Sequence, residues 1–359
     1  MTVLTHTPTT RFSVPEQRFA AEPAERRGLR RDGVRLLVAD GRTEKIEHSR
    51  FDRLPDYLQP GDLVVVNNSQ TIAAELDGIG DGNWPIVLHA ATKLDDGSWV
   101  VELRSAPDAA EPILTAQPGQ QFRFGADAEV TVRLIEPYPS PSGPAGVGNR
   151  LWRAAIESTV PFEQWLAWNG RPISYGYLSR HWPLADYQTV FGRVPGSAEM
   201  PSAGRPFTTE LVTRLVAAGV LVAPITLHTG VSSQEAGEGP QPERFSVPEI
   251  TARLVNDVRC SGGRVIAVGT TVTRALESAA DSDGFVLESH GWTELVLGPE
   301  HPVRVVSGLI TGLHNPDASH LLLVEAVAGA ELTQRAYDAA VGNDYLWHEF
   351  GDSCLILPA

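Results

Sequence analysis

The chain has 359 residues, 42% of them hydrophobic and 20% charged, a composition typical of globular proteins. No apolar run reaches the about eighteen residues of a membrane span, and the polar N-terminal segment lacks a signal-peptide core. Cysteine occurs only at Cys260 and Cys354, which excludes a disulfide framework and a cysteine-based metal site. We therefore expect a cytoplasmic enzyme without a bound metal and with two domains, or one large domain carrying an insertion.

The formal net charge is −15, which disfavours strong binding to nucleic acid. Proteins that grip RNA through its phosphates usually carry a basic stripe. The only dense basic cluster in the sequence consists of Arg26, Arg27, Arg30 and Arg31. It lies within residues 1–32, a Pro-, Thr- and charge-rich segment without periodicity that we expect to be partly ordered at best.

Between Val34 and about Ile135 the pattern is one of short strands separated by Gly, Asp and Pro. Even spacing without helical runs predicts a small antiparallel barrel. Its expected strands include Leu63–Val66, Pro85–Ala90, Trp99–Leu103 and Val130–Ile135. The Pro-, Ser- and Gly-rich stretch at 138–148 reads as a linker or long loop.

Further along, helices and strands alternate, which predicts a largely parallel or mixed layered sheet. Ser246 and Glu249 have the spacing of a capping box in front of a helix. The other expected elements are helices at Pro161–Trp168, Thr209–Ala218, Ser319–Ala328 and Leu332–Ala340, and a strand at Leu221–Leu227.

The segment 264–278 reads as a buried strand, Val265–Val268, that breaks at Gly269 and continues as a helix opening with Thr270 and Thr271. Backbone N–H groups at such a helix start suit a carboxylate or phosphate. Arg274 and Glu277, three residues apart, can share one face of the helix. The same turn also caps many ordinary parallel strands, so the pattern alone does not establish a site.

Nine segments in order carry a resemblance to a known family. They are RLLVAD from Arg35, PGDLVVVNNSQTIAAEL from Pro60, DYQTVF from Asp186, PGSAEMPSAGRPFT from Pro195, PITLHTG from Pro224, ERFSVPE from Glu243, RVIAVGTT from Arg264, GLHNPDASHLLLVEAVAG from Gly312 and YLWHEFGDSCLI from Tyr345. In sequence and spacing the chain resembles the S-adenosylmethionine:tRNA ribosyltransferase-isomerase family, which makes the side group of queuosine.

The resemblance implies an α/β domain with an inserted β-barrel, divided as 1–60 (N-terminal part of the α/β domain, with a flexible start), 61–150 (barrel) and 151–359 (main α/β domain). It implies transfer and isomerisation of the ribosyl moiety of S-adenosylmethionine onto 7-aminomethyl-7-deazaguanine in tRNA, with release of adenine and methionine. S-adenosylmethionine is then a substrate, and no metal or organic cofactor is needed. We expect a cytoplasmic monomer that does not bind membranes.

The resemblance also identifies candidate catalytic residues. His228 follows a predicted strand, where α/β proteins bind ligands, although a histidine there can simply bond the backbone. Glu243 is the retained carboxylate of a family motif, in a predicted loop before a helix cap, where a surface ion pair is the alternative. His314 precedes the turn-forming Asn315-Pro316 and matches a family histidine.

Further residues are expected to bind substrate through the same motifs, with core packing, capping or an Asx-turn as their ordinary alternatives. They are Tyr187, Gln188, Ser202, Gly204, Thr226, Gly269, Thr270, Thr271, Arg274, Glu277 and Asp352.

The chain also departs from the family pattern. Asn68-Ser69-Gln70 replaces Asp-Thr-Arg, Ala73-Ala74-Glu75 replaces Pro-Ala-Arg, and two family histidines are absent. The loss of two positive charges and the gain of Glu75 predict weak tRNA binding, because a carboxylate repels phosphate. Two alternatives therefore stay open: a diverged paralogue that uses a small-molecule acceptor or only cleaves S-adenosylmethionine, and a non-catalytic protein that binds it.

Overall fold

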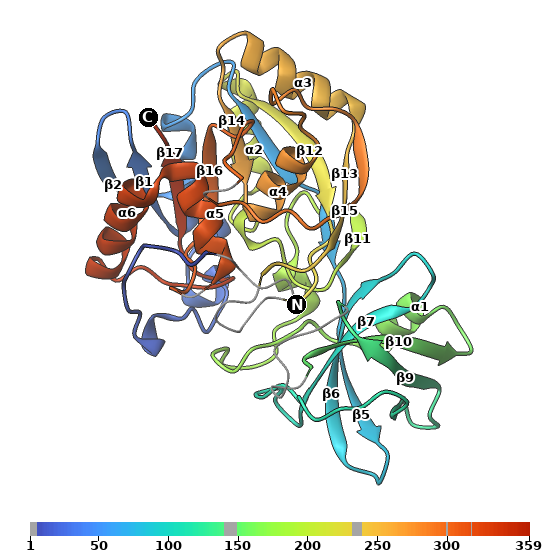
Figure 1. Ribbon diagram of the computed structural model, residues 1–359. Helices are drawn as coiled ribbons and strands as arrows, with labels where there is room; N and C mark the ends of the chain where they lie inside the picture. Colours follow the sequence, from blue (N-terminus) through green and yellow to red (C-terminus); the bar gives the residue numbers. More distant parts are fainter. Residues whose placement is uncertain (1–5, 140–148, 232–238, 299–300, 317) are drawn as a thin grey trace.

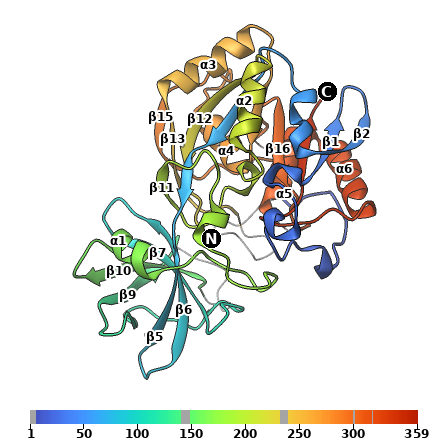
Figure 2. The same cartoon turned by 180° about the vertical axis from the view of Figure 1, so that it is seen from behind.

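The computed structural model describes residues 6–139, 149–231, 239–298, 301–316 and 318–359. It consists of a nine-stranded mixed sheet covered by helices and, to one side, a closed six-stranded β-barrel (Figures 1 and 2). This architecture confirms the expected fold class, a layered α/β domain accompanied by a small antiparallel barrel.

The large sheet has four neighbouring parallel strands at its centre, β12, β3, β14 and β16. From one edge to the other its strands are β15 (Ser289–Thr293), β13 (Glu243–Val247), β12 (Leu221–Leu227), β3 (Leu63–Asn67), β14 (Val265–Val268), β16 (Gly308–Gly312), β17 (Ser353–Leu357), β1 (Arg35–Asp40) and β2 (Lys45–Arg50). The central strands β3 and β14 are apolar at nearly every position because both of their faces are buried.

Alternate side chains of the central strands enter two different cores, one on each face of the sheet. Leu63 and Val65 pack with α3 (Glu249–Cys260), α4 (Thr270–Ser278), α5 (Ser319–Ala328) and α6 (Ala330–Gly342). Val64 and Val66 pack on the opposite face with α2 (Thr209–Ala217) and the 3-10 helix η4 (Phe51–Asp56). The sheet is therefore the middle layer of three.

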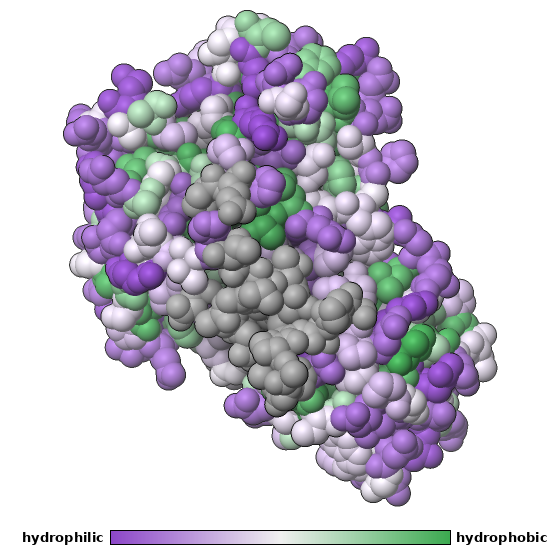
Figure 3. All heavy atoms as spheres, in the orientation of Figure 1, coloured by the Kyte–Doolittle hydropathy of each residue, from purple (hydrophilic) through white to green (hydrophobic). Residues whose placement is uncertain are grey.

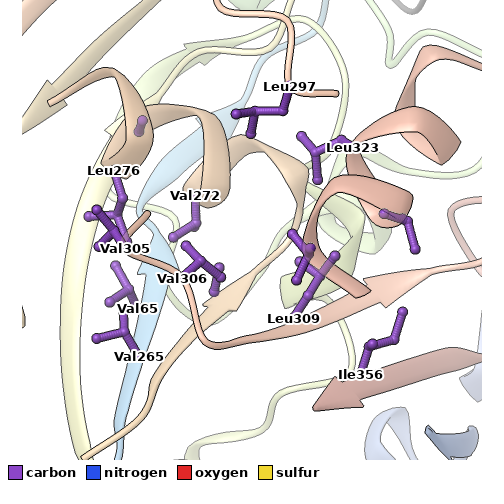
Figure 4. Close-up of a cluster of buried hydrophobic side chains, with 14 of the residues drawn as sticks. Val65, Val265, Val272, Leu276, Leu297, Val305, Val306, Leu309, Leu323 and Ile356 are labelled. Atoms are coloured by element: carbon purple, nitrogen blue, oxygen red, sulfur yellow. The ribbon is translucent and has the colours of Figure 1, made fainter. Parts of the chain in front are cut away.

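The first of these cores fixes the beginning of α4 over the end of β14. Val272 and Leu276 of α4 point toward Val65 and Val265 of the sheet, while Val305 and Val306, which precede β16, close the cluster (Figure 4). Burying an aliphatic side chain of this size contributes about 1.5–3 kcal/mol. The turn between β14 and α4 is thus held by packing on both sides.

The barrel is antiparallel throughout and is filled by aromatic and aliphatic side chains. Its strands, in the order in which they pair around the barrel, are β10 (Leu151–Ser158), β7 (Trp99–Ser105), β6 (Pro85–Lys93), β5 (Glu75–Gly80), β8 (Gln121–Phe124) and β9 (Val130–Pro137). The helix α1 (Phe162–Asn169) adds Phe162, Trp165 and Leu166 to the barrel core. A short parallel pair, β4 (Ser69–Thr71) and β11 (Val194–Ser197), lies between the large sheet and the barrel strands in the chain.

Two expectations about the barrel need correction. The predicted strand Leu63–Val66 is β3 of the large sheet, because its side chains are buried on both faces and cannot alternate between a barrel core and solvent. The barrel strands run from Glu75 to Ser158 and not from 61 to 150, since β10 completes the ring. The division into three domains stays a prediction. Of the predicted linker, residues 140–148 lie outside the described part of the chain.

Two further expectations are wrong: that the N-terminal segment is partly ordered at best, and that Ser246 caps the helix α3. Residues 6–32 pack against the main domain, with Ala20 and Ala24 buried, and they include the 3-10 helices η1 (Glu16–Arg18) and η2 (Ala24–Arg27) and the start of η3 (Arg31–Gly33). The predicted capping box is absent at α3, whose N-cap is Pro248 with no side-chain hydrogen bond, because Ser246 belongs to β13. The remaining 3-10 helices are η5 (Leu184–Tyr187) and η6 (Ser202–Gly204).

Among the described residues, no helix has both the length and the apolar character needed to cross a bilayer. Among the described residues on the face shown in Figure 3, many are hydrophilic, and the apolar ones form small separate patches. Scattered apolar residues of this kind are ordinary on a protein surface.

Candidate active site

A cavity of about 670 Å³ lies at the carboxyl ends of β14 and β16, where the large sheet faces the barrel. Thr270 and Thr271 follow β14 in its lining, and His314 follows β16. The barrel contributes Arg104 and the neighbouring Ala109. Carboxyl ends of parallel strands are the usual ligand-binding edge of an α/β sheet, so the geometry favours this cavity as the active site.

The turn from β14 into α4 has the form that the sequence predicts. Gly269 is its N-cap, with φ of 91° and ψ of 162°, a conformation open essentially only to glycine. A Cβ atom there would lie 3.3 Å from the Cβ of Ala203. The first amides of α4 have no intrahelical acceptor, and Thr270 and Thr271 line the cavity, so the turn can receive an anionic group.

Glu243 and Arg274 form a partly buried ion pair in the cavity wall. Glu243 is the first residue of β13, not part of a loop as predicted, because it pairs with Thr293 of β15. Its carboxylate also accepts from the Gly230 amide, at 3.2 Å. Burial raises the pKa of Glu243, and the Arg274 guanidinium opposes this shift.

His314 is held by a hydrogen bond and by ring stacking. Its Nε2 lies 2.8 Å from the Thr311 hydroxyl, and its ring is 4.9 Å from that of His320 at an interplanar angle of 10°. Burial, with further contributions from His320 and His348, lowers the pKa of His314 well below its ordinary value. The imidazole is therefore neutral at physiological pH and can accept a proton.

His228 is not among the described residues that line the cavity. Its Nδ1 lies 2.7 Å from the Ser69 hydroxyl, which is itself 2.6 Å from the hydroxyl of Ser197. Burial lowers the pKa of His228. This chain of hydrogen bonds joins β4 and β11 to the end of β12, and the catalytic role expected for His228 stays a prediction.

The other expected binding residues divide into two groups. Tyr187 and Ser202 line the cavity beside the turn at Gly269–Thr271 and Arg274. The described lining does not include Gln188, Gly204, Thr226, Glu277 and Asp352.

Those of the second group that have polar side chains bond to the surrounding protein. The Glu277 carboxylate accepts three backbone amides, those of residues 304–306, and burial raises its pKa. The Asp352 carboxylate accepts hydrogen bonds from the backbone amides of Arg35 and Leu346. Thr226 donates to Asn68 Oδ1 at 2.6 Å, and Gln188 donates to the Thr71 carbonyl at 2.9 Å. These contacts favour structural roles.

The cavity also contains residues outside the expected set, among them Tyr175, Tyr177, Glu199 and Glu349. Glu199 and Glu349 lie within two of the segments that carry the family resemblance, so the sequence held a signal for both. The Tyr-Gly-Tyr at 175–177 lies in none of those segments. Only the tertiary structure brings the two tyrosines to the two carboxylates.

One part of the expectation of weak tRNA binding is wrong, namely the part that rests on repulsion by Glu75. Glu75 is 1% exposed and accepts from Arg171 Nε at 2.6 Å and from the Ser174 amide at 3.1 Å. His89 Nε2 lies 3.0 Å from the same carboxylate. A buried and neutralised carboxylate does not repel phosphate at the surface, so Glu75 gives no reason to expect weak tRNA binding.

Comparisons with known proteins agree with this architecture. The family model described as "Queuosine biosynthesis protein" matches residues 8–356. The chain is 34% identical to an S-adenosylmethionine:tRNA ribosyltransferase-isomerase of Thermoanaerobacter sp. over 96% of this chain and 98% of the relative. It is 35% identical to the protein of the same name from Symbiobacterium thermophilum, over the same shares.

A solved structure is similar along its whole length. The crystal structure of an S-adenosylmethionine tRNA ribosyltransferase from Thermotoga maritima matches with a TM-score of 0.52 and 26% identity, covering 96% of this chain and 99% of that one. Family match, relatives and fold span the same residues. The chain therefore belongs to the queuosine biosynthesis protein family.

Proposed function

We propose that this protein is an S-adenosylmethionine:tRNA ribosyltransferase-isomerase of queuosine synthesis and that its chemistry takes place in the cavity at the ends of β14 and β16. The observation that carries the proposal is the convergence, in one cavity, of the Gly269–Thr271 turn, the Glu243–Arg274 pair and His314. The named function of the relatives supports the choice of substrates.

S-adenosylmethionine is the substrate that this lining suits. Its carboxylate complements the amides at the start of α4, and its sulfonium complements a carboxylate of the cavity such as Glu243. No metal or organic cofactor enters the proposal, because the sulfonium itself activates the ribosyl group and makes methionine a good leaving group.

The chemical step needs a group that removes a proton from the ribose 5′ carbon, beside the sulfonium. We assign that role to His314, whose pKa burial holds low enough to keep the ring neutral. The Thr311 hydroxyl at 2.8 Å orients the ring. Glu243, fixed by Arg274 and the Gly230 amide, is placed to accept hydrogen bonds from substrate hydroxyls.

The acceptor is 7-aminomethyl-7-deazaguanine in tRNA. Adenine release tests the function directly: the protein is incubated with S-adenosylmethionine alone and then with tRNA that carries this base. We expect adenine and methionine only when the modified tRNA is present. Adenine from S-adenosylmethionine alone would instead identify an enzyme that cleaves it without tRNA. Tight binding with no adenine under either condition would identify a non-catalytic protein.

A further inference from the structure

Two tyrosines and two carboxylates form one end of the cavity, with His348 beside them; we call these five residues the tyrosine–carboxylate cage. All five line the cavity. The Tyr175 hydroxyl donates to Glu199, and the Tyr177 hydroxyl donates to Glu349. The tyrosine rings are stacked with centroids 6.0 Å apart, and the His348 ring lies 4.4 Å from that of Tyr177. Carboxylates beside aromatic faces are the surroundings that an organic cation prefers.

Two polar atoms, one in the cage and one in another residue of the cavity lining, have no hydrogen-bond partner among the described residues. One is the hydroxyl of Tyr187, a cavity-lining residue that is 3% exposed, and the other is Nε2 of His348. Folded proteins rarely leave such buried atoms unpaired, and each unpaired atom is destabilising. These two atoms therefore point to a ligand that bonds to them.

The charges of the cage favour a cationic ligand. Burial, together with the nearby Glu199, raises the pKa of Glu349 to about 7. Burial lowers the pKa of His348 to about 4, so its ring is neutral and Nε2 can serve as an acceptor. A bound cation would favour the ionised form of Glu349, which the dry surroundings disfavour.

We propose that the tyrosine–carboxylate cage binds a primary ammonium group. An ammonium has three N–H donors, which match the Glu349 carboxylate, His348 Nε2 and the Tyr187 hydroxyl oxygen. A sulfonium has no N–H donor and would leave the last two atoms unpaired. This assignment rests on the proposed function, whose substrates carry two such groups: the α-ammonium of S-adenosylmethionine and the aminomethyl group of the acceptor base.

The cage and the Gly269–Thr271 turn belong to one binding site. The segment from Glu199 to Ala203 joins them, because Ala203 lies against Gly269 and Ser202 lines the cavity between. Four residues span at most about 14 Å, so a single nucleoside-sized ligand, or two ligands in contact, reach from one to the other.

Calorimetry on the full chain tests the proposal with four ligands. They are S-adenosylmethionine, S-adenosylhomocysteine (ammonium without sulfonium), 5′-deoxy-5′-dimethylsulfonioadenosine (sulfonium without ammonium) and 7-aminomethyl-7-deazaguanine. Glu349→Gln and Tyr187→Phe are compared with the wild type. Glu331→Gln, which alters an exposed carboxylate at the start of α6, is the matched control. Thermal unfolding of each variant shows that the fold is kept, and Tyr177→Phe replaces any variant that does not fold.

If the α-ammonium occupies the cage, Glu349→Gln weakens S-adenosylmethionine and S-adenosylhomocysteine alike by about ten- to a hundredfold and leaves the sulfonium analogue unchanged. If the aminomethyl group occupies it, only the deazaguanine base is weakened. Tyr187→Phe weakens the affinity for the same ligand as Glu349→Gln does, by a smaller factor. Either pattern supports the proposal.

The proposal would be overturned if each of the four ligands bound to the variants as tightly as to the wild type. A loss of affinity confined to the two sulfonium compounds would overturn it as well. The outcome is separate from that of the proposed function. If the wild-type protein releases adenine and the variants bind every ligand with wild-type affinity, the proposed function is supported and the role of the cage is contradicted. If ammonium ligands bind in a way that depends on Glu349 but no adenine is released, the role of the cage is supported and the proposed function is contradicted.

Discussion

His314 is a residue whose surroundings determine what it can do. Its ring is half-buried, stacked on His320 and bonded to Thr311, and its pKa is lowered well below the ordinary value. The neutral imidazole therefore persists throughout the neutral pH range. The lowered pKa keeps the ring free to accept a proton and also makes it a weaker base than an ordinary imidazole.

Replacing His314 should reduce turnover without unfolding the protein. We expect His314→Gln to slow adenine release by about two to four powers of ten, the usual contribution of a general base. The matched control is His290→Gln, which alters an exposed histidine of β15 and should leave the rate unchanged. Because the pKa of His314 is depressed, the wild-type rate at saturating concentrations of both substrates, where titration of Glu349 no longer limits binding, should not fall between about pH 8 and 6.5. A decline centred at about 6.5 would contradict the assignment.

Gly269 is the second residue whose local geometry is decisive, and its substitution tests the turn. Gly269→Ala forces a side chain into a backbone conformation that only glycine adopts easily and brings its Cβ within 3.3 Å of Ala203. We expect a loss of about 1–3 kcal/mol in the free energy of unfolding and weaker binding of S-adenosylmethionine. Gly342→Ala, at an open position of α6, controls for the alanine itself. Unchanged stability and affinity would show that the turn is not strained.

At the scale of elements, the barrel strands are joined by a buried ion network. His89 of β6 lies between Glu75 of β5 and Glu102 of β7, at 3.0 and 3.1 Å. Arg104 and Arg150 also donate to Glu102, at 2.8 and 3.0 Å. These contacts lower the pKa of Glu102 to about 2 despite its burial. The network links three adjacent strands near the end of the barrel that faces the cavity.

Removing one charge from this network should be costly. Glu102→Gln leaves two buried guanidinium groups and His89 short of a counter-charge, so we expect about 3–5 kcal/mol less stability in urea unfolding. Glu163→Gln breaks the exposed ion pair with Lys93 and serves as the control. We expect it to lower the free energy of unfolding by less than about 1 kcal/mol. Equal effects of the two substitutions would mean that the barrel tolerates an uncompensated charge.

The same network predicts how stability depends on pH. The two glutamates raise the pKa of His89 against the effect of burial, so its contribution is present below the unfolded value of about 6.5 and is lost as pH rises through the folded value. The lowered pKa values of Glu75 and Glu102 act in the opposite sense, and their contribution disappears as pH falls below about 4.5. Urea unfolding at several pH values should show a fall in stability on the acid side and another on the alkaline side, the acid and alkaline limbs of the profile. His89→Gln should flatten the alkaline one, and an unchanged alkaline limb would rule out a charged His89.

For the whole molecule, the net charge of −15 is not offset by the arginine cluster near the N-terminus. Arg30 and Arg31 are paired with the carboxylates of Asp32, Glu210 and Glu25. Arg26 lies 3.7 Å from Asp186, and Arg27 donates to the Phe350 carbonyl at 2.7 Å. These contacts place carboxylates or a carbonyl beside all four arginines, so part of the positive charge of the cluster is already compensated within the protein.

We therefore expect tRNA to bind weakly and with little dependence on salt. A protein that neutralises fewer than about three phosphates has a slope of log K against log salt shallower than about −3. Filter binding between 50 and 200 mM salt measures the slope. A steep slope and tight binding would reveal a basic surface elsewhere, and substitution of Arg30 by Gln should in either case leave the affinity unchanged.

What the sequence determined alone was local or carried by motifs. Val265–Val268, the break at Gly269 and the helix beginning at Thr270 are where the pattern puts them, because apolar runs, glycine and threonine act on their immediate neighbours. The family resemblance likewise follows from residues in order. It led to the correct family and to His314, Glu243 and Arg274, which the cavity contains.

Only the tertiary structure decided which distant residues meet. The run at Leu63 reads equally well as a barrel strand or a buried sheet strand, since periodicity does not reveal what covers each face. Glu75 looked like a surface charge until its partners Arg171 and His89 were in place. The tyrosine–carboxylate cage joins residues 175–177, 199 and 349, and its chemistry depends on burial and contacts across the fold. Charge, pKa and binding belong to the environment of a side chain, and that environment exists only once the chain is folded.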